Sequence, residues 1–203
     1  MTDKPMTEAP MADEPMTDSE IATLHTTLVE RAAREGLLDV AYRTIDSPVG
    51  SLLLAATPHG LVRVAFESQD HDAVLQALAD RVSPRVLAAP GRLDAAAREL
   101  DEYFAGRRHV FDLPLDLCLA QGFRREVVES LASIAYGRVA TYAQVAAAAG
   151  RPRAGRAVGT ACALNPLPLV LPCHRVVKAD GTPGQYAGGA EAKRALLALE
   201  SAA

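Results

Sequence analysis

Three short apolar segments between residues 40 and 67 limit the folds open to this chain more than any other feature. They lie within VAYRTI at the start of the region and SLLLAATPHGLVRVAF after it. Turn-forming Pro and Gly residues separate them, in SPVG (47–50) and PHG (58–60). Short β-rich runs divided by such turns favour neighbouring antiparallel strands. We therefore expect a small three-stranded antiparallel sheet.

Apolar residues recur at helical spacing on both sides of these strands and through most of the second half of the chain. The segment SPRVLAAPG is read as a connection, and residues 107–117 as an extended linker. The predicted fold class is α+β, with a small domain at 40–117 and a mainly helical domain at 118–203. Helices are expected at 21–36, 70–82, 93–105, 123–135, 141–149 and 153–163.

Residues 1–39 are expected to form a tail followed by a short helix. The first 20 residues are acidic and punctuated by Pro, and Met recurs at positions 1, 6, 11 and 16. Such a composition cannot bury a core, so we interpret this stretch as disordered rather than as a sticky interaction motif. It has no basic flank and apolar centre of a signal peptide.

Charge is divided unevenly along the 203 residues. Residues 1–118 hold 11 basic and 20 acidic side chains, whereas residues 119–203 hold 10 basic and 5 acidic ones. A basic second half is typical of a DNA-binding domain, although an uneven solvated surface would give the same balance. No apolar run approaches the roughly 20 residues that span a bilayer. We expect a cytoplasmic protein, associated with the nucleoid and without a membrane partner.

Two of the expected helices are close enough in sequence to form a helix-turn-helix. Thr141 is expected to cap the first, and GRPR (150–153) turns the chain, with Pro152 in the first turn of the second. The second helix carries Arg153 and Arg156. Short helix pairs are common, so this pattern alone is weak evidence for DNA binding.

The chain contains three cysteines, and their spacing fits neither a disulfide framework nor a metal site. Cys118 and Cys162 are interpreted as ordinary buried residues. Cys173 differs, because LPCHRVV (171–177) sets it beside His174 after an apolar run. A thiol attacks only as its thiolate, and a nearby imidazole can take its proton. Such a histidine would need an orienting carboxylate from elsewhere in the chain.

Further motifs strengthen that interpretation. NPLPLVLPCHRVV (165–177) is followed by YAGG (186–189) and KRALLALE (193–200), and preceded by YGRVATYAQVA (136–146) and RAVGTA (156–161). In their order and spacing these segments closely resemble the O6-alkylguanine-DNA alkyltransferases, as do SPVGSLLLAA (47–56) and EYFAG (102–106). The resemblance covers about residues 40–200. It implies a ribonuclease-H-like first domain and a helix-turn-helix of winged-helix type in the second.

The resemblance also implies roles for single residues. Cys173 would accept the alkyl group once and permanently, activated through a water held by His174, which Glu200 orients. Asn165 would tie the recognition helix to the active-site loop, and Tyr142 would serve both the DNA backbone and the base. The expected base pocket comprises Pro168, Val176, Tyr186, Ala187 and Lys193.

The expected partner is double-stranded DNA that carries O6-alkylguanine, bound through its minor groove by a monomer. O4-alkylthymine as a substrate and cooperative assembly on DNA are left open. Arg156 would fill the gap left by the extruded base, and Ala157 would permit close approach of the recognition helix. The candidate phosphate contacts are Arg124, Arg125, Arg151 and Arg153. The resemblance implies no cofactor, and no zinc cluster is apparent in the first half.

Two rival functions deserve comparison with this one. Alkyltransferase-like proteins bind alkyl lesions without repairing them, but they lack the acceptor cysteine that Cys173 would supply. A cysteine hydrolase would need an oxyanion site and multiple turnover, and nothing in the sequence indicates either. The resemblance, with Cys173 present, therefore implies a single-turnover DNA-repair methyltransferase.

Overall fold

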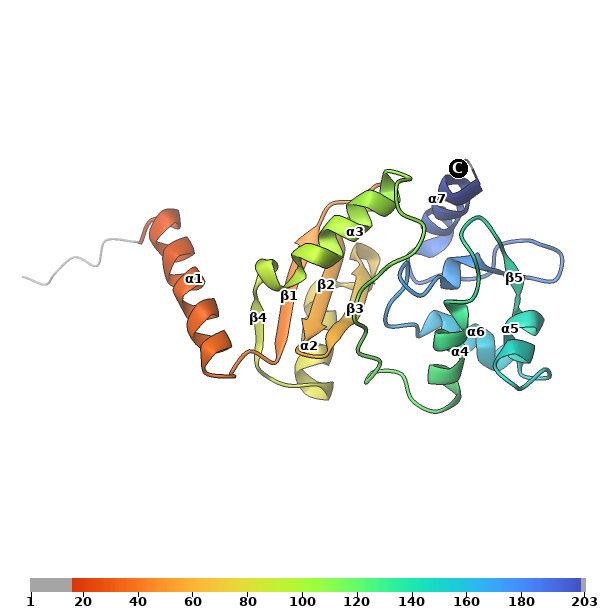
Figure 1. Cartoon of the computed structure of the whole chain (residues 1–203), viewed down its shortest axis with the longest axis horizontal. Helices are drawn as coiled ribbons and strands as arrows, with labels where there is room; N and C mark the ends of the chain where they lie inside the picture. The colour runs from red at the N-terminus through yellow and green to blue at the C-terminus, as the bar shows by residue number, and fades with distance from the viewer. Residues whose placement is uncertain (1–15, 202–203) are drawn as a thin grey trace, which may run out of the picture.

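The computed structural model describes residues 16–201 and consists of a sheet-containing part followed by a helical part (Figure 1). Most of the predicted disordered tail lies outside the described residues. Helix α1 (Asp18–Arg34) begins three residues before the predicted start, so the last residues of that tail are helical. The reason is a capping box in which Thr17 and Glu20 satisfy each other's backbone N–H groups.

The sheet has four strands rather than the predicted three. β1 (Val40–Ile45), β2 (Leu52–Thr57) and β3 (Gly60–Phe66) form the expected antiparallel meander. The fourth strand, β4 (Val86–Ala88), pairs in parallel with β1 and gives the order β3-β2-β1-β4. It lies in the segment that the sequence had indicated as a connection. Three half-buried residues show no alternation, so their pairing was not apparent from the sequence.

Helices cover both faces of this sheet (Figure 1). Helix α2 (His71–Arg81) packs Val74 and Leu78 against one face. Helix α3 (Asp94–Phe104) packs against the other face, within a core that continues into the helical part. Both faces are therefore buried, which explains why β2 is almost continuously apolar.

Residues 105–122 join the two parts and run along the edge of the sheet. Leu61 donates its backbone N–H to Pro114 and accepts one from Asp116, beside β3. Gly60 permits this approach, because a Cβ there would lie 2.3 Å from the Pro114 carbonyl oxygen. The β3 edge is also bonded to the helical part, since the Val64 N–H donates to the Pro166 carbonyl at 2.9 Å.

The second part is mainly helical, as predicted. Thr141 caps its helix as expected, with its side chain accepting from the Gln144 N–H. The prediction for Pro152 is wrong: the following helix begins only at Gly155, so this proline belongs to the preceding turn. The sequence also predicted that the helix-turn-helix is of winged-helix type, and this stays a prediction. The helices are α4 (Phe123–Leu131), α5 (Tyr142–Ala148), α6 (Gly155–Ala163) and α7 (Gly189–Ser201), and β5 (Ala140–Thr141) pairs in parallel with β6 (Val176–Val177).

Within the described part of the chain, no helix is both long and apolar enough to cross a bilayer.

Candidate active site

Cys173 begins a single helical turn, η3 (Cys173–Arg175), directly after the apolar segment 167–171. Its side chain is almost fully enclosed, with 2% of the residue exposed. Asn165, just beyond the end of α6, donates from Nδ2 to the Cys173 Sγ at 3.2 Å and to the Leu171 carbonyl at 2.8 Å. Its Oδ1 accepts from the Leu167 N–H. Asn165 therefore fixes the sulfur relative to α6.

His174 lies next to the sulfur in sequence and is bound from the far side by Glu200 of α7. The His174 Nε2 and the Glu200 Oε1 are 2.8 Å apart, and both side chains are buried. The other ring nitrogen, Nδ1, is buried and has no hydrogen-bond partner among the described residues. Burial lowers the pKa of His174 more than the Glu200 carboxylate raises it. The imidazole is therefore neutral at pH 7, with its free lone pair on Nδ1.

Glu200 binds several groups at once. Arg175 donates to its two oxygens from Nε at 2.8 Å and Nη2 at 2.9 Å, and the Gly137 N–H donates at 3.2 Å. The Tyr103 hydroxyl donates to Oε1 at 2.7 Å from α3, in the first part of the chain. Burial alone would raise the pKa of Glu200, but the hydrogen bonds from His174 and Arg175 lower it to about 2. The carboxylate is thus charged at pH 7 and held by several hydrogen bonds.

The sulfur itself is not a stabilised thiolate. Burial raises the pKa of Cys173 to about 11, and the hydrogen bond from Asn165 offsets only part of this increase. At pH 7 roughly one molecule in 10⁴ would carry a thiolate at such a pKa. A base that removes the proton during the reaction therefore matters more here than at an exposed cysteine.

Several predicted pocket residues pack against the hydrophobic core that contains Cys173. Tyr142 and Tyr186 pack against the core cluster that contains Cys173 and Val176, and Ala187 does the same. Pro168 is buried in the segment that precedes the cysteine. Lys193 donates from Nζ to the Val176 carbonyl at 2.6 Å and is fully buried.

The chain beyond β6 packs closely against Tyr142 and itself contains Tyr186. A Cβ at Gly184 would lie 2.1 Å from the Tyr142 hydroxyl oxygen, so a larger residue there would have to displace the Tyr142 side chain. Tyr186 places its ring edge against Phe66 of β3, with centroids 5.4 Å apart. Its hydroxyl is buried and has no partner within the described residues. The loop that contains Gly184 and Tyr186 therefore packs against Tyr142 on one side and Phe66 on the other.

The predicted DNA-contacting residues lie on and before α6. Arg156 and Ala157 are exposed in its first turn, and Arg153 is exposed in the preceding turn. Arg151 is exposed as well, but its guanidinium lies over the Phe123 ring at 4.7 Å. The same group forms a salt bridge with Glu126 at 3.7 Å, so contacts within the protein hold it.

Comparison with known proteins assigns this arrangement to a family. Residues 122–202 match the domain described as "6-O-methylguanine DNA methyltransferase, DNA binding domain". Residues 40–117 match its "ribonuclease-like domain". Proteins named methylated-DNA–protein-cysteine methyltransferase from Mycobacterium tuberculosis and Methanosarcina barkeri are 39% and 37% identical to the chain. These alignments cover 79% and 78% of the chain, and 92% and 96% of the relatives. The chain belongs to the methylated-DNA–protein-cysteine methyltransferase family.

Solved structures of the family agree with this assignment. The O6-methylguanine methyltransferase of Mycobacterium tuberculosis is 39% identical, with a TM-score of 0.70. A structure of the same organism's protein in complex with DNA is 37% identical, with a TM-score of 0.68. Each comparison covers 80% of this chain and 93% of the other. The methyltransferase fold thus accounts for both parts of the chain, whereas α1 precedes the matched residues.

Two residues of the methyltransferase site were not predicted from the sequence. Arg175 stands in the quoted LPCHRVV motif, but no pattern indicated that it would bind Glu200 from two nitrogens. Tyr103 lies 97 positions from Glu200 and looks like an ordinary core residue of an amphipathic helix. The EYFAG motif contains Tyr103 and was the one signal that could have directed attention to it.

We expect Tyr103→Phe to slow alkyl transfer several-fold and to lower the free energy of unfolding by about 1–3 kcal/mol. It removes a buried hydrogen bond to a carboxylate while keeping the ring. Phe104→Leu, a change on the same helix without a bond to Glu200, serves as the control. Rates with O6-benzylguanine and urea denaturation would measure the two effects. An unchanged rate in Tyr103→Phe would contradict a positioning role.

Proposed function

We propose that this methyltransferase repairs DNA by moving the alkyl group of O6-alkylguanine onto its own Cys173. The observation that carries the proposal is that Cys173 directly precedes His174, whose ring is bound by Glu200, in a chain of this family. A buried thiol, a neutral imidazole with a free nitrogen and a fixed carboxylate together supply a nucleophile, a base and its orienting group.

The transfer follows from the protonation states of these groups. The Cys173 thiol gives its proton to the His174 Nδ1 through a water, while the Nε2–H donates to Glu200. The thiolate attacks the alkyl carbon, the carbon–sulfur bond forms, and the carbon–oxygen bond to guanine breaks. The electron pair of that bond stays on guanine, which takes up one proton. Tyr142 is the proposed donor of that proton, since burial raises its pKa and its hydroxyl is protonated at pH 7. Tyr142 then regains a proton from solvent, to which the His174 imidazolium releases the proton that it took from the thiol.

Single turnover is a consequence of the product. A thioether is neither nucleophilic nor readily displaced, so Cys173 would stay alkylated. Asn165 positions the thiol, and Lys193 would keep the pocket backbone at Val176 in place. Tyr186, Ala187 and Pro168 would enclose the base. The methyltransferase therefore acts as both catalyst and consumed reagent, and it requires no cofactor.

The target atom is inaccessible within a base stack, so the nucleotide must leave the duplex. We propose that α6 enters the minor groove, where Ala157 permits close approach and Arg156 occupies the space of the extruded base. The groove offers a degenerate pattern of hydrogen-bonding groups, which suits repair in any sequence. Arg153 would contact a phosphate. The proposed form is a monomer that acts in the cytoplasm on nucleoid DNA.

We expect Arg156→Ala to slow repair of duplex O6-methylguanine at least tenfold while changing the reaction with free O6-benzylguanine less than twofold. Only the duplex substrate requires a filled gap after base extrusion. Arg107→Ala removes the same charge from an exposed position after α3 and should leave both rates unchanged. Equal losses with both substrates would contradict the proposed role of Arg156.

A further inference from the structure

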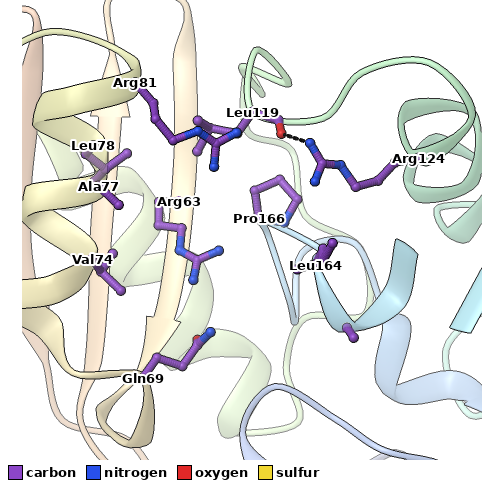
Figure 2. Close-up of a pocket in the computed structure, with 11 residues that line it drawn as sticks. Arg63, Gln69, Val74, Ala77, Leu78, Arg81, Leu119, Arg124, Leu164 and Pro166 are labelled. Atoms are coloured by element: carbon purple, nitrogen blue, oxygen red, sulfur yellow. Dashed lines mark hydrogen bonds between the residues drawn. The ribbon is translucent and has the colours of Figure 1, made fainter. Parts of the chain in front are cut away.

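A cavity of about 210 Å³ separates α2 and β3 from the end of α6, and no step of the proposed repair reaction uses it. Arg63 of β3, Arg81 of α2 and Arg124 of α4 contribute their guanidinium groups from three sides. Figure 2 shows these three side chains directed toward the space beside Pro166. Both parts of the chain are therefore needed to form the cavity.

The charged side chains that line this cavity are all positive. No carboxylate is among its lining residues in the described chain. Neither Arg63 nor Arg81 forms a salt bridge anywhere within residues 16–201. Burial lowers the pKa of the half-buried Arg63, and the charge of Arg81 lowers it further. Two guanidinium groups thus repel each other with no anion between them.

Arg124 and Gln69 also supply hydrogen-bond donors to the cavity. Arg124 is anchored through Nη2 to the Leu119 carbonyl, which orients its guanidinium. Its Nε is buried without a hydrogen-bond partner in the described chain. Gln69 uses Oε1 to accept from the Phe66 N–H, which leaves its NH₂ group as a donor. Buried donors normally find an acceptor, so this set is complementary to an anion.

We propose that this cavity binds a phosphate group, held by Arg63, Arg81 and Arg124. Guanidinium groups from three directions match the several oxygens of a tetrahedral oxyanion better than the two oxygens of a carboxylate. Free phosphate or a phosphorylated small molecule is one source of this group. The DNA backbone is the other, because Arg124 and Leu164 also line the groove along α6 that contains Ala157 and Thr160. The proposal does not depend on alkyl transfer.

The first test measures binding of inorganic phosphate to the full chain by calorimetry, with ionic strength held constant by NaCl. We expect saturable binding that weakens roughly tenfold to a hundredfold in Arg63→Gln and Arg124→Gln, the loss expected for a charged hydrogen bond. Arg81→Gln lies at the exposed rim and tests the same site without disturbing the core. The control Arg107→Gln makes the same charge change outside the cavity and should bind phosphate normally.

The second test identifies the source of the phosphate group from the salt dependence of binding to an undamaged duplex. If the DNA backbone occupies the cavity, Arg63→Gln and Arg81→Gln should each reduce the slope by about one. An unchanged slope together with phosphate binding would identify a free phosphate compound as the ligand. Failure to bind phosphate with an unchanged slope, or equal binding by all variants, would overturn the proposal. Arg63→Gln should still react with O6-benzylguanine, which separates this outcome from failure of the repair function.

Discussion

A duplex that contains one O6-methylguanine is expected to leave a single additional CH₂ on the peptide that contains Cys173, with one methyl group per protein molecule. The thiol is held by Asn165 and lies beside the only imidazole that Glu200 binds within the described chain. Cys173→Ser should reduce transfer below detection, a loss of at least about 10³-fold, because a hydroxyl at its ordinary pKa is a far weaker nucleophile. Peptide mass mapping after a timed incubation would measure both results.

The matched control is Cys162→Ser on α6. Cys162 is also buried, and burial raises its pKa to about 12, but no hydrogen bond from Asn165 positions its sulfur. The methyl group should therefore still appear on Cys173 in this variant. More than one methyl group released per protein would favour a hydrolase, and tight binding without modification would favour a lesion-binding protein. Either result would contradict the proposed repair reaction.

The second large effect is expected for Glu200→Gln, which should slow transfer by about two to three orders of magnitude while changing DNA affinity little. The amide keeps the size of the side chain but removes the charge that His174 and Arg175 bind. A positioned base contributes about 10²–10⁴-fold to such reactions. Rates with a duplex substrate and binding to the same duplex would separate the two effects. Glu129→Gln, on the exposed surface of α4, is the control.

The same substitution should change how folding depends on pH. The folded pKa of Glu200, about 2, lies below its unfolded value near 4.5. The carboxylate therefore stabilises the fold fully above pH 4.5, and this stabilisation is lost as the pH falls toward 2. Denaturation between pH 6 and 3 should show a smaller decrease in stability for Glu200→Gln than for the wild type. Parallel curves would show that folding does not lower the pKa of Glu200.

The sequence was informative where local pattern decides structure. The turns in SPVG and PHG predicted the meander, and Thr141 predicted the start of α5. It was misleading at Pro152, where a favourable first-turn residue is instead used in the turn before α6. It also missed β4, because a three-residue strand depends on pairing with β1, about 46 positions earlier.

The active site, too, could be predicted from the sequence only in part. Cys173 and His174 were apparent because they adjoin each other, but chemistry alone predicted only that some carboxylate must orient the imidazole. Family resemblance was needed to select Glu200. Tyr103 and the phosphate cavity depend on contacts between distant segments, and neither has a local pattern. A buried tyrosine or a single arginine looks the same in sequence whether or not it has such a contact.

The hydrogen bond from Tyr103 to Glu200 has a consequence for the evolution and engineering of this protein. One residue of the sheet-containing part donates a hydrogen bond to Glu200, the carboxylate of the proposed reaction in the helical part. The first part is therefore not an inert carrier that can be exchanged for any stable module. A chimera with a foreign first part would have to supply its own hydroxyl at this position. Without that hydroxyl, the Glu200 carboxylate would be held less firmly, both before and after alkylation of the protein.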